Sequence, residues 1–221
     1  MKTNDVQIKT ILLSIVLVIM IAGFVNAQKV RLNGYSAYVF DDKVDSYYDA
    51  SNYYNGKIKG GYQWGVGLEY MVHETKGIEL KYLRQDAMAP MNYYYNGIQF
   101  KEFELGLNYI LIGGSNYFKT AGGVVEPYGG LGIGLAIFNI KNPEPGTDSS
   151  KEKFAWNVKA GTNIWVTESV GIKLHAELIS AVQSAGGGFY FGSGGSGAGI
   201  STYSSMYQFS LGGGLTFKIG Q

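Results

Sequence analysis

Three titratable residues alternate along one short stretch of the chain: Lys173, His175 and Glu177. Residues two apart on a β-strand point to the same side, so this spacing would bring a cation, an imidazole and a carboxylate together. A histidine beside a carboxylate can transfer protons, and an acidic cluster can bind a charged ligand. The same groups can instead neutralise one another in a structural network of ion pairs.

Other charged residues would join this set if the remaining strands alternate in the same way. The predicted polar network consists of Arg31, Glu69, Glu79, Lys81, Glu102, Glu104, Glu126, Lys159, Lys173, His175 and Glu177. Acids and bases nearly balance, which favours a structural network over a binding or proton-transfer site. The chain has two histidines and no cysteine, so neither a metal nor a cofactor is expected.

The elements that position these residues are β-strands, because period-two alternation recurs and no window shows helical periodicity. The clearest case is residues 62–72, where even positions such as Tyr62, Trp64 and Tyr70 are large and apolar. Similar segments are predicted at residues 30–40, 78–85, 103–109, 129–135, 156–161, 172–178 and 207–212. Each can extend to the roughly 9–11 residues that a tilted strand needs to cross a bilayer.

The connections between these segments alternate in length. Long polar stretches at residues 41–57, 86–98, 141–151 and 180–204 are separated by tight turns at residues 73–76 and 167–169. The link at residues 113–123 is longer than this pattern predicts. Long loops at one end and short turns at the other are typical of an up-and-down transmembrane barrel. We therefore predict an all-β fold, an eight-stranded antiparallel up-and-down transmembrane β-barrel.

Side-chain volume decides which face of the predicted barrel meets lipid. The interior of an eight-stranded barrel is only just wide enough to be filled by side chains, so the large apolar residues cannot all lie inside. The 33 glycines favour the same arrangement, since many fall on the polar face, where they make room. The predicted lipid-facing aromatic girdle consists of Tyr62, Trp64, Tyr70, Phe103, Tyr109, Trp156, Tyr207, Phe209 and Phe217.

The first 27 residues are predicted to be an export signal. Lys2 and Lys9 precede an apolar run at residues 11–25, and Val25-Asn26-Ala27 fits a signal peptidase site. The run is short for a membrane-spanning helix, which favours cleavage after Ala27 over an uncleaved anchor. The mature chain, residues 28–221, is neutral overall and has no basic run, so no nucleic-acid partner is expected.

From residue 28 to residue 221 the chain resembles the small eight-stranded outer-membrane barrels of Gram-negative bacteria, grouped as porin-family or outer-membrane-protein-X/A-like proteins. The resemblance rests on the signal, the eight alternating segments and the closing strand at residues 207–219. It implies location in the outer membrane, contact with its lipid, and insertion by the barrel-assembly machinery. That machinery reads a terminal aromatic residue in this family, whereas here Phe217 is followed by four more residues.

The loops could contact a protein or a glycan, although anchoring at the membrane interface is the favoured role of their tyrosines. They are rich in tyrosine, which offers a large contact area at low entropy cost, or anchors the membrane interface. These tyrosines are Tyr47, Tyr48, Tyr53, Tyr54, Tyr93, Tyr94 and Tyr95.

The predicted function is a non-enzymatic barrel with a plugged polar lumen that supports membrane integrity or presents its loops for adhesion. Ser180 and Ser184 lie near His175, but no nucleophile motif surrounds them, and an inward His175 would not reach lipid. A narrow channel for small solutes and a lipid-active barrel enzyme are the alternatives.

Overall fold

The computed structural model describes residues 30–49, 52–94, 98–141, 149–182, 188–192, 195–199 and 206–219. Within these ranges the strands are β1 (Val30–Val39), β2 (Asp42–Asp49), β3 (Asn52–Ile58), β4 (Gly61–His73), β5 (Lys76–Tyr94), β6 (Ile98–Tyr117), β7 (Val125–Lys141), β8 (Ser149–Trp165), β9 (Val170–Val182), β10 (Gly188–Gly192), β11 (Gly195–Gly199) and β12 (Met206–Ile219). In this part of the chain no helix is long and apolar enough to cross a membrane. The predicted signal, residues 1–27, lies outside the described residues.

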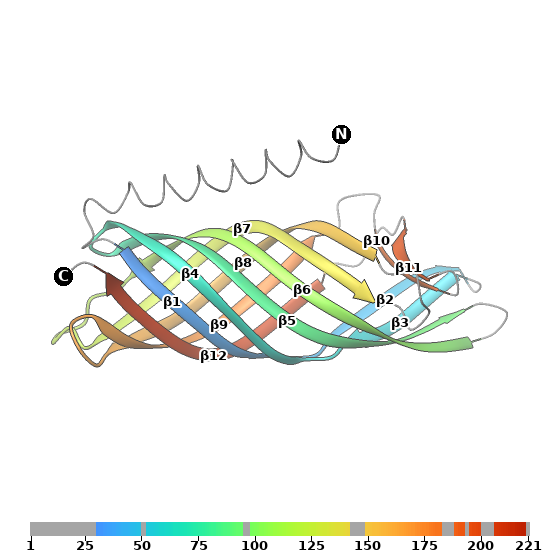
Figure 1. The fold of residues 1–221 in the computed structure, drawn as a ribbon, viewed down its shortest axis with the longest axis horizontal. Helices are drawn as coiled ribbons and strands as arrows, with labels where there is room; N and C mark the ends of the chain where they lie inside the picture. The colour runs from blue at the N-terminus through green and yellow to red at the C-terminus, as the bar shows by residue number, and fades with distance from the viewer. Residues whose placement is uncertain are drawn as a thin grey trace, which may run out of the picture.

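The long strands close into a single antiparallel barrel (Figure 1). Around the barrel the order is β1, β12, β9, β8, β7, β6, β5 and β4, and the pairing of β4 with β1 completes the circle. The first and last barrel strands pair from Val30 opposite Ile219 to Val39 opposite Ser210. The predicted fold class is therefore confirmed, and each of the eight predicted segments corresponds to one of these strands; the segment at residues 30–40 runs one residue past the end of β1.

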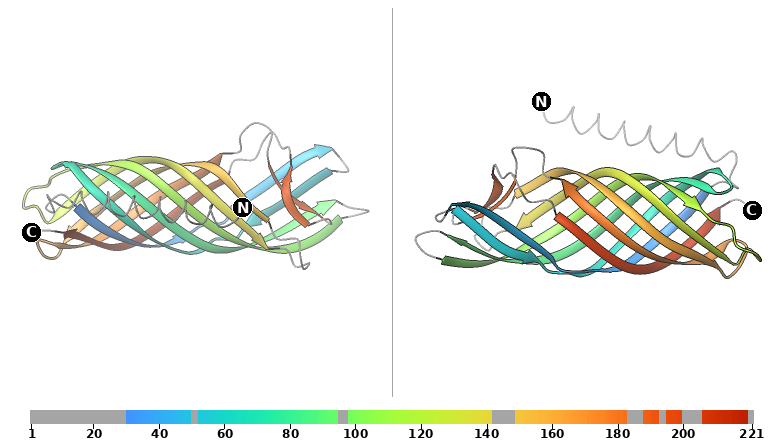
Figure 2. Two further views of the ribbon diagram at one scale, coloured as in Figure 1. Left: turned by 45° about the horizontal axis from the view of Figure 1, so that its top comes forward. Right: turned by 180° about the vertical axis from the view of Figure 1, so that it is seen from behind.

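Strand pairing continues beyond the barrel at the end opposite Val30 and Ile219, as Figure 2 shows for β2 and β3. β5 and β6 also stay paired as far as Tyr94 opposite Ile98. The polar stretches at residues 41–57 and 86–98 are thus largely strand rather than loop. Apolar alternation did not reveal these strands, because a strand in water need not show an apolar face. The side chains of the loop tyrosines predicted to make contacts lie outside the described residues.

The other end of the barrel is closed by short turns. In the β8–β9 turn, the Thr167 hydroxyl accepts a hydrogen bond from the backbone N–H of Val170 at 2.9 Å. β6 continues to Tyr117 and β7 begins at Val125, so residues 113–117 of the link predicted at residues 113–123 are strand and the turn itself is shorter than predicted. Gly122 and Gly123 have φ angles of 88° and 68°, which glycine adopts readily, and they let this turn reverse the chain.

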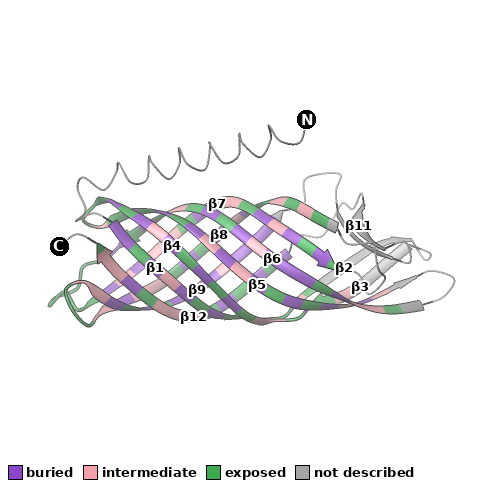
Figure 3. Ribbon diagram, viewed as in Figure 1, coloured by how far each residue is buried: buried purple, intermediate pink, exposed green. Residues whose placement is uncertain are grey.

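Inward and outward residues alternate along every barrel strand (Figure 3). The outer wall is apolar over the middle of the barrel, where Leu131, Ile133 and Leu135 of β7 are each about half exposed or more. Polar and charged residues lie on the inner side at the same level, among them Lys159 and Asn157 of β8. An apolar outer band around a polar interior is the arrangement of transmembrane β-barrels.

Candidate functional site: the barrel interior

The structure places nine of the eleven residues of the predicted polar network inside the barrel, and all nine are buried. They are Arg31, Glu69, Glu79, Lys81, Glu126, Lys159, Lys173, His175 and Glu177. These residues come from β1, β4, β5, β7, β8 and β9, so the closed sheet brings together side chains from distant parts of the sequence. We call this set the charged layer.

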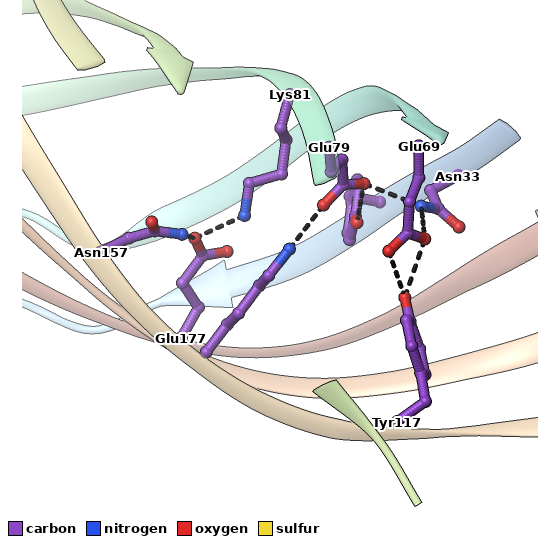
Figure 4. A network of polar contacts seen from close by, with 9 residues as sticks. Asn33, Glu69, Glu79, Lys81, Tyr117, Asn157 and Glu177 are labelled. Atoms are coloured by element: carbon purple, nitrogen blue, oxygen red, sulfur yellow. Dashed lines mark hydrogen bonds and ion pairs between the residues drawn. The ribbon is translucent and has the colours of Figure 1, made fainter. Parts of the chain in front are cut away.

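Three ion pairs cross the interior between strands that are not neighbours in the sheet. Arg31 donates to both carboxylate oxygens of Glu126, at 2.9 and 3.1 Å. Lys81 Nζ lies 2.5 Å from Glu177 Oε1, and Lys159 Nζ lies 2.6 Å from Glu79 Oε2 (Figure 4). A hydrogen-bonded partner of opposite sign offsets the cost of removing each charge from water.

Polar and aromatic groups hold the remaining two charges of the layer. Glu69 accepts hydrogen bonds from the Tyr117 hydroxyl at 2.6 and 2.7 Å and from Asn33 Nδ2 at 3.3 Å (Figure 4). The Lys173 ammonium lies 4.5 Å from the centre of the Tyr128 ring, a cation–π contact. The charged layer thus contains four carboxylates and four cations, and its formal charge is balanced.

His175 is enclosed within the layer and does not face the lipid. Its ring packs edge-on against Tyr35 with 5.3 Å between ring centres, and only 7% of the residue is exposed. Its Nδ1 atom is buried and has no hydrogen-bond partner among the described residues. A proton-transfer role for His175 with Glu177 would need a partner for this nitrogen and a path to a substrate.

Glycines on the inner face make the space that the carboxylates occupy. A Cβ atom on Gly67 would come 2.2 Å from Glu79 Oε1, and one on Gly77 would come 2.2 Å from Glu69 Oε1. Both distances are far shorter than a van der Waals contact. Any larger residue at these positions would displace a carboxylate from its partners.

Four predicted positions are wrong, and all of them lie on β6. Glu102 and Glu104 face outwards, where they pair with Lys59 at 2.9 Å and Lys141 at 3.7 Å. Phe103 and Tyr109, predicted to face lipid, have no exposed surface and point into the barrel. The reason is that this part of β6 reaches the outer rim, where the surroundings of the barrel become polar and its interior becomes apolar.

An apolar cluster, which the sequence did not predict, fills the outer half of the interior above the charged layer. Its members include Met91, Phe103, Leu105, Leu107, Phe138, Ile140 and Met206, all almost fully buried. We call this set the apolar layer. Between the layers, the Tyr109 hydroxyl donates to Gln208 Oε1 at 2.6 Å, and Gln208 Nε2 donates to Gln85 Oε1 at 3.0 Å.

Neutral residues that the sequence alone did not predict complete the charged layer. Tyr35, Tyr117 and Tyr128 and the amides Asn33, Asn157 and Asn163 lie inside beside the charged groups. Their alternation with outward apolar residues could have identified most of them, since Asn33 and Tyr35 share the inward positions of Arg31.

The other seven residues of the predicted aromatic girdle occupy outward positions. Tyr62, Trp64, Tyr70, Tyr207 and Phe209 are exposed, and Trp156 and Phe217 are partly covered by neighbours. Trp64 packs edge-on against Tyr82, and Trp156 against Tyr207. They lie towards both ends of the apolar band, where aromatic side chains suit the boundary between hydrocarbon and headgroups.

Comparison with known proteins finds no matching family model and no matching curated protein. Solved structures do match. Neisserial surface protein A aligns with a TM-score of 0.55 and 14% identity, over 86% of this chain and 96% of the other. The N-terminal β-barrel domain of OprF from Pseudomonas aeruginosa aligns over 86% of this chain and 98% of that domain, with 16% identity and a TM-score of 0.41. The closed barrel and the match to Neisserial surface protein A show that the chain has the fold of the small eight-stranded outer-membrane β-barrels.

Proposed function

We propose that this protein is an exported, non-enzymatic outer-membrane barrel with a sealed interior, which supports the membrane and presents its outer loops for contact. The observation that carries the proposal is the filling of the interior by two layers, one charged and one apolar. The fold shared with Neisserial surface protein A supports the location.

The charged layer supports the sealed interior because its groups are engaged with one another. Cross-barrel ion pairs such as Lys81–Glu177 and Lys159–Glu79 bridge the lumen in the middle of the apolar band. Near the short-turn end, the Arg31 guanidinium lies 5.2 Å from the Trp165 ring centre and the Lys218 ammonium lies 3.9 Å from it. An ion crossing this region would have to break buried charge pairs, each of which costs several kcal/mol to disrupt.

The apolar layer supports the same conclusion for the outer half. Phe103, Leu107 and Met91 are completely buried, and Phe138 and Ile140 nearly so. A constriction lined by such side chains is dry and excludes ions. The alternative of a narrow solute channel would require both layers to open.

A conductance measurement in planar bilayers tests the sealed interior. The wild type is expected to give no steady single-channel current. A Phe103→Ala/Phe138→Ala variant, which removes two large side chains from the apolar layer, shows whether loosening the interior can be detected. Ile133→Ala, on the lipid-facing wall, is the matched control. Stepwise conductance in the wild type equal to that of a known narrow pore would refute the proposal.

The enzyme alternative is tested at His175. We expect the lipid composition of cells producing the wild type and His175→Ala to be identical by mass spectrometry, because His175 is enclosed by Tyr35 and lies within the lumen. A lipid or peptide modification that is present with the wild type and lost with the variant, while the variant still folds, would establish the enzyme instead.

Export and assembly complete the proposal. We expect a cleaved signal, a mature N-terminus at Gln28, insertion by the barrel-assembly machinery, contact with outer-membrane lipid, and a protein or glycan partner at the loops. The intact mass of protein extracted from membranes tests the cleavage. A mass that retains residues 1–27 would contradict it.

A further inference from the structure

A polar patch interrupts the outer wall of the barrel where β5, β6 and β7 approach the outer rim. The strand register places outward residues in three rows across these strands. The rows are Arg84, Asn108 and Ile137; then Asp86, Gly106 and Asn139; then Met88, Glu104 and Lys141. Gly106 is the centre of this array, and six of the eight side chains around it are polar.

A pocket of about 330 Å³ opens in the wall around Gly106. We call it the rim pocket, lined by Lys59, Arg84, Asp86, Glu104, Asn139 and Lys141 around Gly106. A Cβ atom on Gly106 would come 2.8 Å from Arg84 Nη2, so the guanidinium lies directly against the glycine backbone.

The Arg84 guanidinium is held in place but retains hydrogen-bonding capacity. Its Nη1 donates to Asn108 Oδ1 at 2.9 Å, Nη2 donates to Asp86, and the Tyr82 hydroxyl donates to the same Asn108 oxygen at 2.8 Å. These contacts use two of the five N–H groups that an arginine carries. A fixed guanidinium with free donors is well suited to bind phosphate oxygens in a bidentate manner.

Two lysines add to the positive charge of the pocket. The Lys141 ammonium lies 3.7 Å from Glu104, a loose pair in which both side chains are about two-thirds exposed. Lys59 pairs with Glu102 at 2.9 Å, and its side chain is about half exposed. Both ammonium groups can therefore turn towards a ligand at little cost, because exposed ion pairs contribute little.

The position of the pocket along the barrel indicates which molecules can reach it. Arg84 pairs across the sheet with Trp64, an exposed residue of the aromatic girdle. On β6, the outward Ile110 and Ile112 on the membrane side of Asn108 are apolar and exposed. The rim pocket thus begins where the apolar band ends, at the level of lipid headgroups.

We propose that the rim pocket binds the phosphorylated sugar headgroup of an outer-leaflet glycolipid. Arg84, Lys59 and Lys141 hold the phosphate, while Asp86, Glu104 and Asn139 accept hydrogen bonds from sugar hydroxyls. The carboxylates favour this ligand over a bare anion because a bare anion lacks the sugar hydroxyls that donate hydrogen bonds to them. The volume is at the lower end of the range for small-molecule pockets and suits one phosphorylated ring. The inference rests on the proposed outer-membrane location.

Lipid binding by the folded protein in detergent tests this inference, with native mass spectrometry as the readout. The probes are bis-phosphorylated lipid A, the same lipid A after enzymatic removal of its phosphates, and inorganic phosphate as competitor. We expect the wild type to bind the phosphorylated lipid about tenfold more tightly than the dephosphorylated one. Arg84→Gln and Gly106→Leu, which fills the pocket, should each lose about tenfold, equivalent to about 1.4 kcal/mol.

Lys57→Gln is the matched control, since it removes one exposed cation from the same end of the barrel but outside the pocket. It should bind lipid like the wild type. Equal binding by Arg84→Gln and Lys57→Gln, with both folded, would overturn the inference. So would equal binding of the two forms of lipid A, or full displacement by millimolar phosphate, which would indicate a site for free anions. The conductance test of the sealed interior does not depend on any of these outcomes.

Discussion

Glu177→Gln should destabilise the barrel strongly although it changes neither the size nor the shape of the side chain. Glu177 is 1% exposed and accepts hydrogen bonds from Lys81 at 2.5 Å and from Asn157. At this distance, and with an effective dielectric constant of about 20, the attraction between the two charges is about 7 kcal/mol. A glutamine at this position keeps part of this attraction, because its side-chain oxygen can still accept a hydrogen bond from Lys81. The net loss from leaving Lys81 charged, buried and unpaired should be about 3–5 kcal/mol.

The assay is equilibrium unfolding in urea with the protein folded in lipid vesicles. Glu102→Gln is the matched control, because the same substitution then falls on an exposed pair with Lys59 and should cost about 0–1 kcal/mol. The double variant Lys81→Met/Glu177→Gln removes both charges. It should be more stable than the sum of the two single variants predicts, by about 0.5–3 kcal/mol.

Two results would refute this reasoning. If Glu177→Gln costs no more than Glu102→Gln, the buried pair contributes no more than a surface pair, and the interior must be wetter than the structure indicates. If the costs of the two single variants simply add, Lys81 and Glu177 do not act as a pair.

Three further predictions concern the faces of the barrel and its outer rim. Leu131→Arg, on the lipid-facing wall, should cost about 2–4 kcal/mol in the same urea assay, and a neutral result would mean that this wall does not face hydrocarbon. Phe103→Ala should cost about 3–5 kcal/mol because the ring is buried in the apolar layer; a loss below 1 kcal/mol would place it outside. Burial raises the pKa of Asp42 to about 6, despite hydrogen bonds from the N–H groups of Tyr207 and Lys43. Because the folded state then binds the proton more tightly than the unfolded chain, the stability that Asp42 contributes at low pH should be lost as the pH rises from about 4 to 6. Asp42→Asn should remove this dependence, and a carboxyl titration by NMR with a midpoint near 4 would contradict it.

The sequence predicts correctly which residues face inwards wherever the surroundings of the barrel are apolar and its interior is polar. Along residues 62–72, lipid selects large apolar side chains outside and the charged layer selects polar or small ones inside, so alternation marks both faces. Around residues 103–109 the interior is apolar and the surroundings are polar. The apolar residues of the alternating pattern therefore face inwards there, and the polar residues face outwards. The run Tyr109, Ile110, Leu111 and Ile112 marks the exchange, because consecutive residues are apolar where inner and outer faces are both apolar.

The partners within the interior could not be predicted from alternation. Arg31 and Glu126 lie on β1 and β7, which face each other across the lumen, and nothing local indicates that they lie at the same height. The height at which two side chains meet depends on the stagger of all the intervening strand pairs. Alternation therefore indicates that a residue faces inwards, whereas the closed sheet determines which residue it contacts.

The pairing of β1 with β12 has a consequence for the order of events in folding. The strand that completes the circle is the last to be synthesised, and its partners on either side are β1 and β9. Until residues 206–219 arrive, both of these strands present a free edge, and unpaired backbone groups in hydrocarbon cost several kcal/mol each. Bringing the two ends of the chain together also costs conformational entropy, which makes this step slow. A chain truncated before β12 would therefore have seven of the eight barrel strands and two unpaired strand edges, which hydrocarbon does not tolerate.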